Sequence, residues 1–123
     1  MNTITWILTG VLAVIFTFSG LAKSTMSRDR LIASGQTGIA PFPMPLVRVV
    51  AVLELVAVVG LVAPWLSGTA RVLTPLAAVG LGVVLIGASV SHASLREPKA
   101  TAATVTFLVL CAFVAGSRFA ALA

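Results

Sequence analysis

Four long apolar segments constrain the fold of this chain more than any other feature. They cover residues 4–22, 46–66, 72–92 and 102–120. A helix needs roughly 20 mostly apolar residues to cross about 30 Å of hydrocarbon, and none of the segments alternates with the period of two that membrane strands show. The sequence therefore predicts an all-α integral membrane protein, a four-transmembrane-helix bundle in which residues 1–123 form one domain.

The charged residues are too few for a water-soluble domain. Only 9% of the residues are charged and 59% are hydrophobic, whereas soluble domains carry about a quarter charged residues. The net charge of +5 would suit a nucleic-acid partner, but the basic residues lie between apolar blocks and form no stripe that could follow phosphates. We therefore expect contact with the lipid bilayer and no nucleic-acid partner.

The connection between the first two apolar segments is the longest one. Residues 27–34 of this connection are expected to form a short helix at the membrane interface. Three prolines follow before the second segment begins. The last of them, Pro45, fits the first turn of the second helix, where a missing backbone N–H removes no helical hydrogen bond.

Lysine and arginine are distributed unevenly between the two sides of the predicted bundle. Because cytoplasmic loops carry an excess of these residues, we expect a multi-pass protein with both termini outside. Trp6 and Trp65 then fall at the outer boundary, where indoles prefer to lie, and Arg71 and Arg118 become surface anchors there. The six basic residues assigned to the cytoplasmic side are Lys23, Arg28, Arg30, Arg48, Arg96 and Lys99.

Glu54 interrupts the second apolar segment, where an ionised carboxylate facing lipid would be costly. We expect it to face the bundle interior, within hydrogen-bond or one-water reach of a polar group from the first or third helix. The same half of the membrane holds four candidates for that group, which are Ser19, Lys23, Ser89 and His92.

Two roles for Glu54 stay open. It either ties helices together through a hydrogen bond or ion pair, or it lines a polar pocket, open to the cytoplasm, for a proton, a quinone head group or a small ligand. His92 is either part of that pocket or an interfacial histidine without a ligand. Arg48 is expected to reach lipid phosphates, and Arg96, Glu97 and Lys99 are expected to form a solvated loop.

Small residues recur at helical spacing in the third apolar segment. The side that carries Gly80, Gly82 and Gly87 is expected to pack against another helix of the same chain or of a second copy, because small residues allow close approach in lipid. Pro75 fits the first turn of this helix. Cys111 lies in an apolar run, where a small hydrophobe is expected, and no residues are spaced for a metal site.

Four stretches, in order along nearly the whole chain, carry a family resemblance. FSGLAK, VRVVAVLELVAVVGLVAP, LTPLAAVGLGVVLIGASVSH and VAGSRF resemble the DoxX-like family of small four-helix bacterial membrane proteins. Two places depart from the family's pattern: Ala51 stands where a glycine is usual, and ASLREP replaces a compact RRGE-like run. The matching positions are Lys23, Arg48, Glu54, Pro64, Pro75, His92 and Arg118.

The resemblance implies a bacterial cytoplasmic (inner) membrane and a link to redox complexes, since the family name comes from a subunit of a thiosulfate:quinone oxidoreductase. It favours a small accessory subunit, non-catalytic on its own, that anchors or modulates a membrane-associated partner complex, with a redox complex as the first candidate. The partners it suggests are other membrane or redox proteins and a second copy of the chain in a homo-oligomer. One alternative is a quinone-interacting subunit with Glu54, His92 and Lys23 around the head group. Another is a small proton or solute transporter that uses Glu54. No cofactor is expected other than a quinone.

Overall fold

The protein is an all-helical bundle in a computed structural model that describes residues 2–123. Four helices are long and apolar enough to cross a membrane: α1 (Asn2–Thr25), α3 (Met44–Ser67), α4 (Leu73–Ser94) and α5 (Pro98–Leu122). The short helix α2 (Arg28–Ala33) and the 3-10 turn η1 (Thr37–Ile39) connect α1 to α3. Residues 2–123 contain no strand. The predicted all-α membrane fold is confirmed.

Local sequence signals set the helix boundaries. The side chain of Ser27 accepts a hydrogen bond from Arg30 N and starts α2, which confirms the short helix expected there. Pro45 stands in the first turn of α3, as expected. Gly68 ends α3 with a φ of 75°, a left-handed conformation that glycine adopts without a steric penalty.

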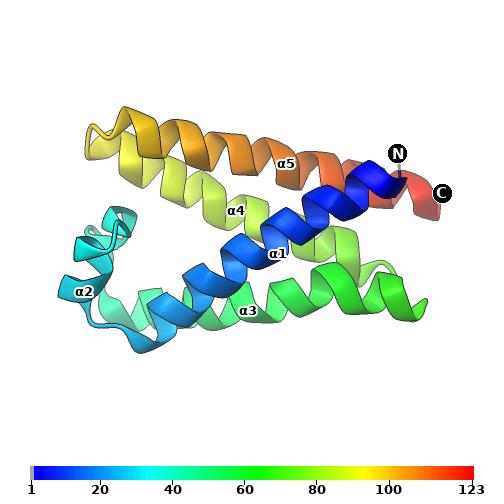
Figure 1. Ribbon diagram of the computed structural model, residues 1–123, viewed down its shortest axis with the longest axis horizontal. Coiled ribbons are helices and arrows are strands. Elements are labelled where there is room, and N and C mark those ends of the chain that lie inside the picture. Colours follow the sequence, from blue (N-terminus) through cyan, green and yellow to red (C-terminus); the bar gives the residue numbers. More distant parts are fainter. Residues whose placement is uncertain (1) are drawn as a thin grey trace.

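The four long helices pack in pairs that leave the bundle unequal at its two ends. α1 packs against α3, α3 against α4, and α4 against α5. Figure 1 shows the start of α1 and the end of α5 together at one end of the bundle. At the other end α3 and α4 stand apart, and α2 lies in that region, while η1 contacts α4. The separated ends of α3 and α4 are therefore closed by the connection between α1 and α3.

The core and the outer surface are both apolar. Outward-facing side chains such as Phe18 and Val83 are 71% and 63% exposed, and such a surface suits a lipid environment. A second, smaller cluster of Leu31, Ile39 and Val47 fixes the α1–α3 connection against the bundle. The main core cluster combines Leu12, Phe16, Leu61, Ala78, Leu81, Leu85, Cys111, Val114 and Ala115 from all four long helices.

Candidate functional site

Glu54 lies inside the bundle, where its side chain meets two polar groups of α1. The residue is 0% exposed. Its Oε1 accepts a hydrogen bond from the Ser19 hydroxyl at 3.3 Å and lies 3.4 Å from Lys23 Nζ. Ser19 and Lys23 are four residues apart and therefore occupy one face of α1. Glu54 Oε2 has no hydrogen-bond partner within the described part of the chain.

Gly20 brings α1 and α3 close enough for these contacts. A Cβ atom at this position would lie 2.7 Å from Leu55 Cγ and 3.1 Å from the backbone oxygen of Ala51. Only glycine accepts such a close approach without a shift of its neighbours. Ser19 and Lys23 therefore reach Glu54 because Gly20, on the face of α1 that meets α3, carries no side chain.

Arg48 holds the same region from the α3 side. Its Nη1 donates a hydrogen bond to the backbone oxygen of Lys23 at 2.6 Å. Carbonyls in the last turn of a helix lack intrahelical partners and attract cations, and α1 ends at Thr25. Arg48 therefore ties the start of α3 to the end of α1, and its expected contact with lipid phosphates stays a prediction.

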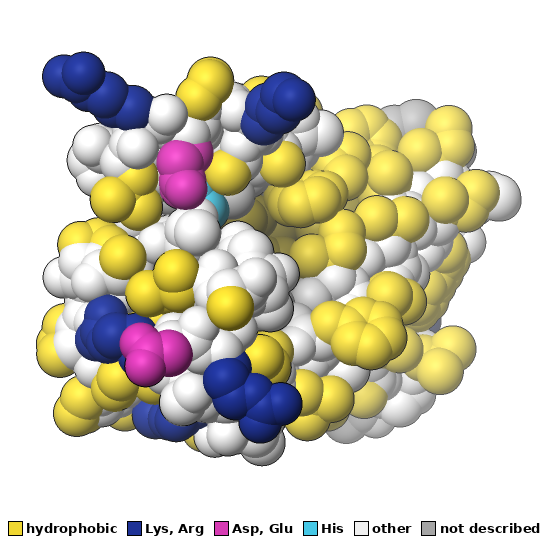
Figure 2. Space-filling model, turned by 60° about the vertical axis from the view of Figure 1, so that its left-hand side comes forward, with side chains coloured by type: hydrophobic (Ala, Val, Ile, Leu, Met, Phe, Trp, Pro, Cys, Tyr) yellow, Lys and Arg dark blue, Asp and Glu magenta, His cyan; other side chains and the backbone are white. Residues whose placement is uncertain are grey.

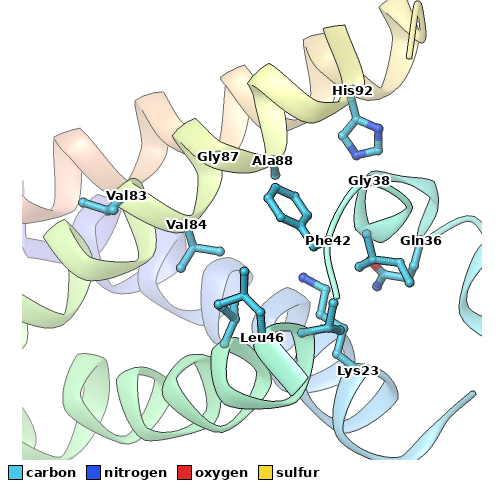
Figure 3. Close-up of a pocket in the computed structure, with 13 residues that line it drawn as sticks. Lys23, Gln36, Gly38, Phe42, Leu46, Val83, Val84, Gly87, Ala88 and His92 are labelled. Carbon is cyan, nitrogen blue, oxygen red and sulfur yellow. The ribbon is translucent and has the colours of Figure 1, made fainter. Parts of the chain in front are cut away.

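A pocket of about 290 Å³ opens beside Lys23, between the separated parts of α3 and α4. Figure 3 shows the Lys23 amine and the Phe42 ring directed towards this space, with Leu46 and Val84 on facing helices. Most of the lining is apolar, and the polar side chains are those of Lys23, Gln36 and His92. The sequence pattern did not indicate Gln36 or Phe42, because both lie in an irregular connection without periodicity. The remaining lining residues are Gly38, Ile39, Val47, Val50, Val83, Gly87 and Ala88.

His92 and Ser89, the other two expected partners of Glu54, bind elsewhere. His92 Nδ1 lies 2.8 Å from Glu97 Oε1, and the Ser89 hydroxyl donates to Thr104 Oγ1 at 2.9 Å. The rotation of α4 turns Ser89 towards α5, so it does not face α3. His92 still lines the pocket, at the end closed by η1. The structure thus brings Ser19, Lys23 and Glu54 together, and it places His92 at another wall of the pocket that Lys23 lines.

Glu97 and its neighbours fasten η1 to the end of α4. Glu97 Oε1 accepts a hydrogen bond from Thr37 Oγ1 at 2.8 Å, and the same oxygen lies beside His92 Nδ1. The Ser91 hydroxyl donates to the backbone oxygen of Gly38 at 2.6 Å. The expectation that Glu97 belongs to a merely solvated loop is therefore corrected. We call these contacts among Thr37, Gly38, Ser91, His92 and Glu97 the η1 latch.

Acid is expected to weaken the η1 latch. Hydrogen bonds from His92 and Thr37 favour the charged carboxylate and lower the pKa of Glu97 below its ordinary value. The stabilising effect of Glu97 is therefore fully present above the ordinary glutamate pKa, and it is lost as the pH falls through the lower, folded-state value. Hydrogen exchange of the amides of residues 37–40 should be slower in wild type than in Glu97→Gln at pH 7, and this difference should vanish in acid. An equal difference at both pH values would contradict the assignment.

Arg118 lies at the opposite end of the bundle and is buried, with 2% exposure. Its Nη1 donates to Asn2 Oδ1 at 3.1 Å, and its guanidinium carbon stands 4.7 Å from the Trp6 ring centroid and 4.5 Å from that of Trp65. The expectation that Arg118 is a surface anchor is wrong, because α1 and α3 enclose it with two indole faces. Arg71 is exposed, as expected, and stands 5.4 Å from the Trp65 ring.

The glycines of α4 do not share one packed face. Gly82 is buried, and a Cβ atom there would lie 3.5 Å from Leu108 Cδ1 and 3.9 Å from Cys111 Cβ. Gly80 and Gly87 are exposed, and nothing lies within 4 Å of a Cβ atom at either position. The expected close packing therefore holds within the chain for Gly82 alone. Pro75 stands in the first turn of α4, as expected.

Comparison with known protein families finds a match over most of the chain. The model of the DoxX-like family matches residues 7–114, which include all of α3 and α4, most of α1 and the larger part of α5. No curated protein and no solved structure matches the chain. Within residues 2–123, no three His, Cys, Asp or Glu side chains come together as metal ligands would.

Proposed function

Because the chain belongs to the DoxX-like family, we propose that this membrane protein is an accessory subunit of a redox complex and binds a quinone head group beside Lys23. The redox centre that exchanges electrons with the quinone belongs to the partner protein. The membrane is the bacterial cytoplasmic membrane. The pocket end faces the cytoplasm, since the Lys and Arg bias of the loops favours that orientation.

The observation that carries the proposal is the position of the Lys23 ammonium group, a charged hydrogen-bond donor on a pocket wall that is mostly apolar. Lys23 lines the pocket, and its side chain is 14% exposed. Its ammonium group has three N–H donors, of which the contact with Glu54 uses one. The others are available for a ligand oxygen. A quinone carbonyl is an acceptor of the required kind, and its ring suits apolar walls.

Glu54 and Phe42 complete this arrangement. Glu54 holds the ammonium group at the wall through the 3.4 Å contact and compensates its charge. Phe42 extends its ring into the pocket (Figure 3), where it offers an aromatic face for a quinone ring. Arg28 fixes the backbone on which this ring stands, because its guanidinium donates to the backbone oxygens of Ala40 and Phe42.

Titration of a short-chain ubiquinone analogue into the protein in lipid nanodiscs tests the proposal. Lys23→Met is expected to weaken binding about tenfold, because a hydrogen bond to a charged group contributes about 1.5–3 kcal/mol. Phe42→Ala is expected to weaken it as well, and it leaves the Lys23–Glu54 contact intact. Lys99→Met removes an exposed lysine outside the pocket and is the matched control. Equal affinities of the wild type and the two pocket variants would contradict the proposal.

The accessory role has its own test. A redox enzyme that co-purifies with the chain in mild detergent should lose quinone reductase activity when Lys23 is replaced by methionine, while it remains bound to the chain. Unchanged activity in the bound complex would show that the pocket does not serve the partner.

A further inference from the structure

The pocket has a polar end and an apolar end. Lys23, Gln36 and His92 lie at the polar end, which η1 closes. The apolar end runs along α3 and α4 towards the middle of the bundle and reaches Val83. Val83 precedes His92 by nine residues, which corresponds to about 14 Å along a helix. The pocket is therefore long enough for a head group and the first part of a chain.

The apolar end opens sideways onto the surface that faces lipid. Two of its lining side chains, Leu46 on α3 and Val83 on α4, are 44% and 63% exposed. Gly87 lies between Val83 and the polar end, and the space over its Cα is empty. The spanning parts of α3 and α4 stand in the bilayer, so this opening meets acyl chains and not water. Figure 2 shows the His side chain at the border of a hollow with hydrophobic walls.

Access to the polar end from water is obstructed. The η1 latch holds residues 37–39 against α4 through Ser91 and Glu97. A Cβ atom at Gly38 would lie 2.9 Å from His92 Nε2, so the turn packs directly on the imidazole ring. The open side between α3 and α4 is the less obstructed route for a ligand.

The charges around the polar end are internally paired. Lys23 pairs with Glu54, and His92 pairs with Glu97. The two nearby arginines bind backbone oxygens, Arg48 that of Lys23 and Arg28 those of Ala40 and Phe42. No unpaired cation of the described chain lines the pocket, because Arg30, Arg96 and Lys99, which lie at this end of the bundle without an ion pair, are not among its lining residues. A neutral head group with acceptor oxygens suits this site better than an anionic one.

We infer that the occupant of this pocket is a neutral amphiphile with a single apolar chain, which enters from the bilayer between α3 and α4 and leaves its chain against Gly87. This inference rests on the proposed function for the head group. It adds that the ligand carries an apolar tail, that it enters from the bilayer, and that its head group is neutral. The head group takes a hydrogen bond from Lys23, and the chain passes between Leu46 and Val83 into lipid.

Two glycines of α4 provide a matched pair for the test. Gly80 and Gly87 are both exposed and both have empty space at the Cβ position, but only Gly87 lines the pocket. Leucine at either position is therefore accommodated by the fold, and thermal unfolding should confirm this for both variants. Binding to nanodiscs would be measured with three probes: a chain-free benzoquinone head group, the same ring with a decyl chain, and decyl phosphate.

The expected result is a loss that is specific to the chain and to one glycine. Gly87→Leu should weaken binding of the decyl quinone about tenfold, the effect of roughly two methylene groups no longer buried, and leave the chain-free ring unaffected. Gly80→Leu should change the binding of neither quinone. Each probe also partitions into the nanodisc lipid, but this contribution is the same for all variants and cancels when they are compared. Decyl phosphate should bind wild type more weakly than the decyl quinone does.

Other results would overturn the inference in distinguishable ways. Equal effects of Gly87→Leu and Gly80→Leu on the decyl quinone, with the chain-free ring still bound through Lys23, would refute the chain site and leave the proposed function standing. Tighter binding of decyl phosphate would refute the neutral head group. Binding of neither quinone would refute the proposed function and this inference together.

Discussion

Replacing Glu54 with leucine is expected to lower the free energy of unfolding by about 3 kcal/mol, because removal of one partner of a buried ion pair leaves the other uncompensated. Lys23 would keep its charge beside a newly apolar wall, and Ser19 would lose its acceptor. Glu54→Gln should cost less, about 1 kcal/mol, since the amide oxygen still accepts hydrogen bonds. Reversible unfolding in mixed detergent micelles measures both values.

A double-mutant cycle separates the ion pair from the packing of Glu54. Lys23→Met combined with Glu54→Leu removes both charges and fills the site with apolar atoms, so the pair should recover most of the stability that Glu54→Leu loses. Additive losses in the double variant would show that Lys23 and Glu54 do not interact in the folded protein.

Replacing Arg118 with alanine is expected to lower the free energy of unfolding by about 3 kcal/mol, since it empties the space between two indoles and removes both cation–π contacts. The side chain joins α5 to Trp6 of α1 and Trp65 of α3. Unfolding in mixed micelles, followed by tryptophan fluorescence, reports on the same cluster directly.

Two further variants show which property of Arg118 matters. Arg118→Met keeps the length without the charge, and it should stay within about 1 kcal/mol of wild type, because the desolvation cost of a buried charge disappears with the attraction to the rings. Arg71→Ala removes an exposed cation from the same ring of Trp65 and should cost at most about 1 kcal/mol. Equal losses for Arg118→Ala and Arg71→Ala would show that the burial of Arg118 contributes nothing.

Hydropathy predicted the spanning helices because the bilayer imposes a length and an apolar composition on each of them. The contact of Glu54 with Ser19 and Lys23 could also be predicted. A buried carboxylate needs a polar partner, and Ser19 and Lys23, four residues apart, present polar groups on one face of their helix. The rotation of α4 about its own axis could not be predicted, so Ser89 and His92 were expected beside Glu54, whereas they bind Thr104 and Glu97. The burial of Arg118 was missed for a related reason: a sequence does not show whether a terminal arginine extends to the surface or folds between neighbouring indoles.

The connection between α1 and α3 was the least predictable part. Pro45 indicated where α3 begins, but Gln36, Thr37 and Phe42 follow no periodic pattern. Thr37 and the adjacent Gly38 are held by Glu97 and Ser91, which lie more than fifty residues away in the chain. Such contacts have no local signature, and the walls of the pocket therefore became visible only in the folded protein.

The unequal ends of the bundle give it a mechanical polarity. Arg118 and the two indoles hold three helices at one end, whereas at the other end α3 and α4 are bridged by a short turn and a few hydrogen bonds. We therefore expect the end held by Arg118 to resist lateral pressure in the bilayer better than the end bridged by η1. A change in acyl-chain packing is then expected to alter the gap between α3 and α4 before it alters the spacing of the helices around Arg118.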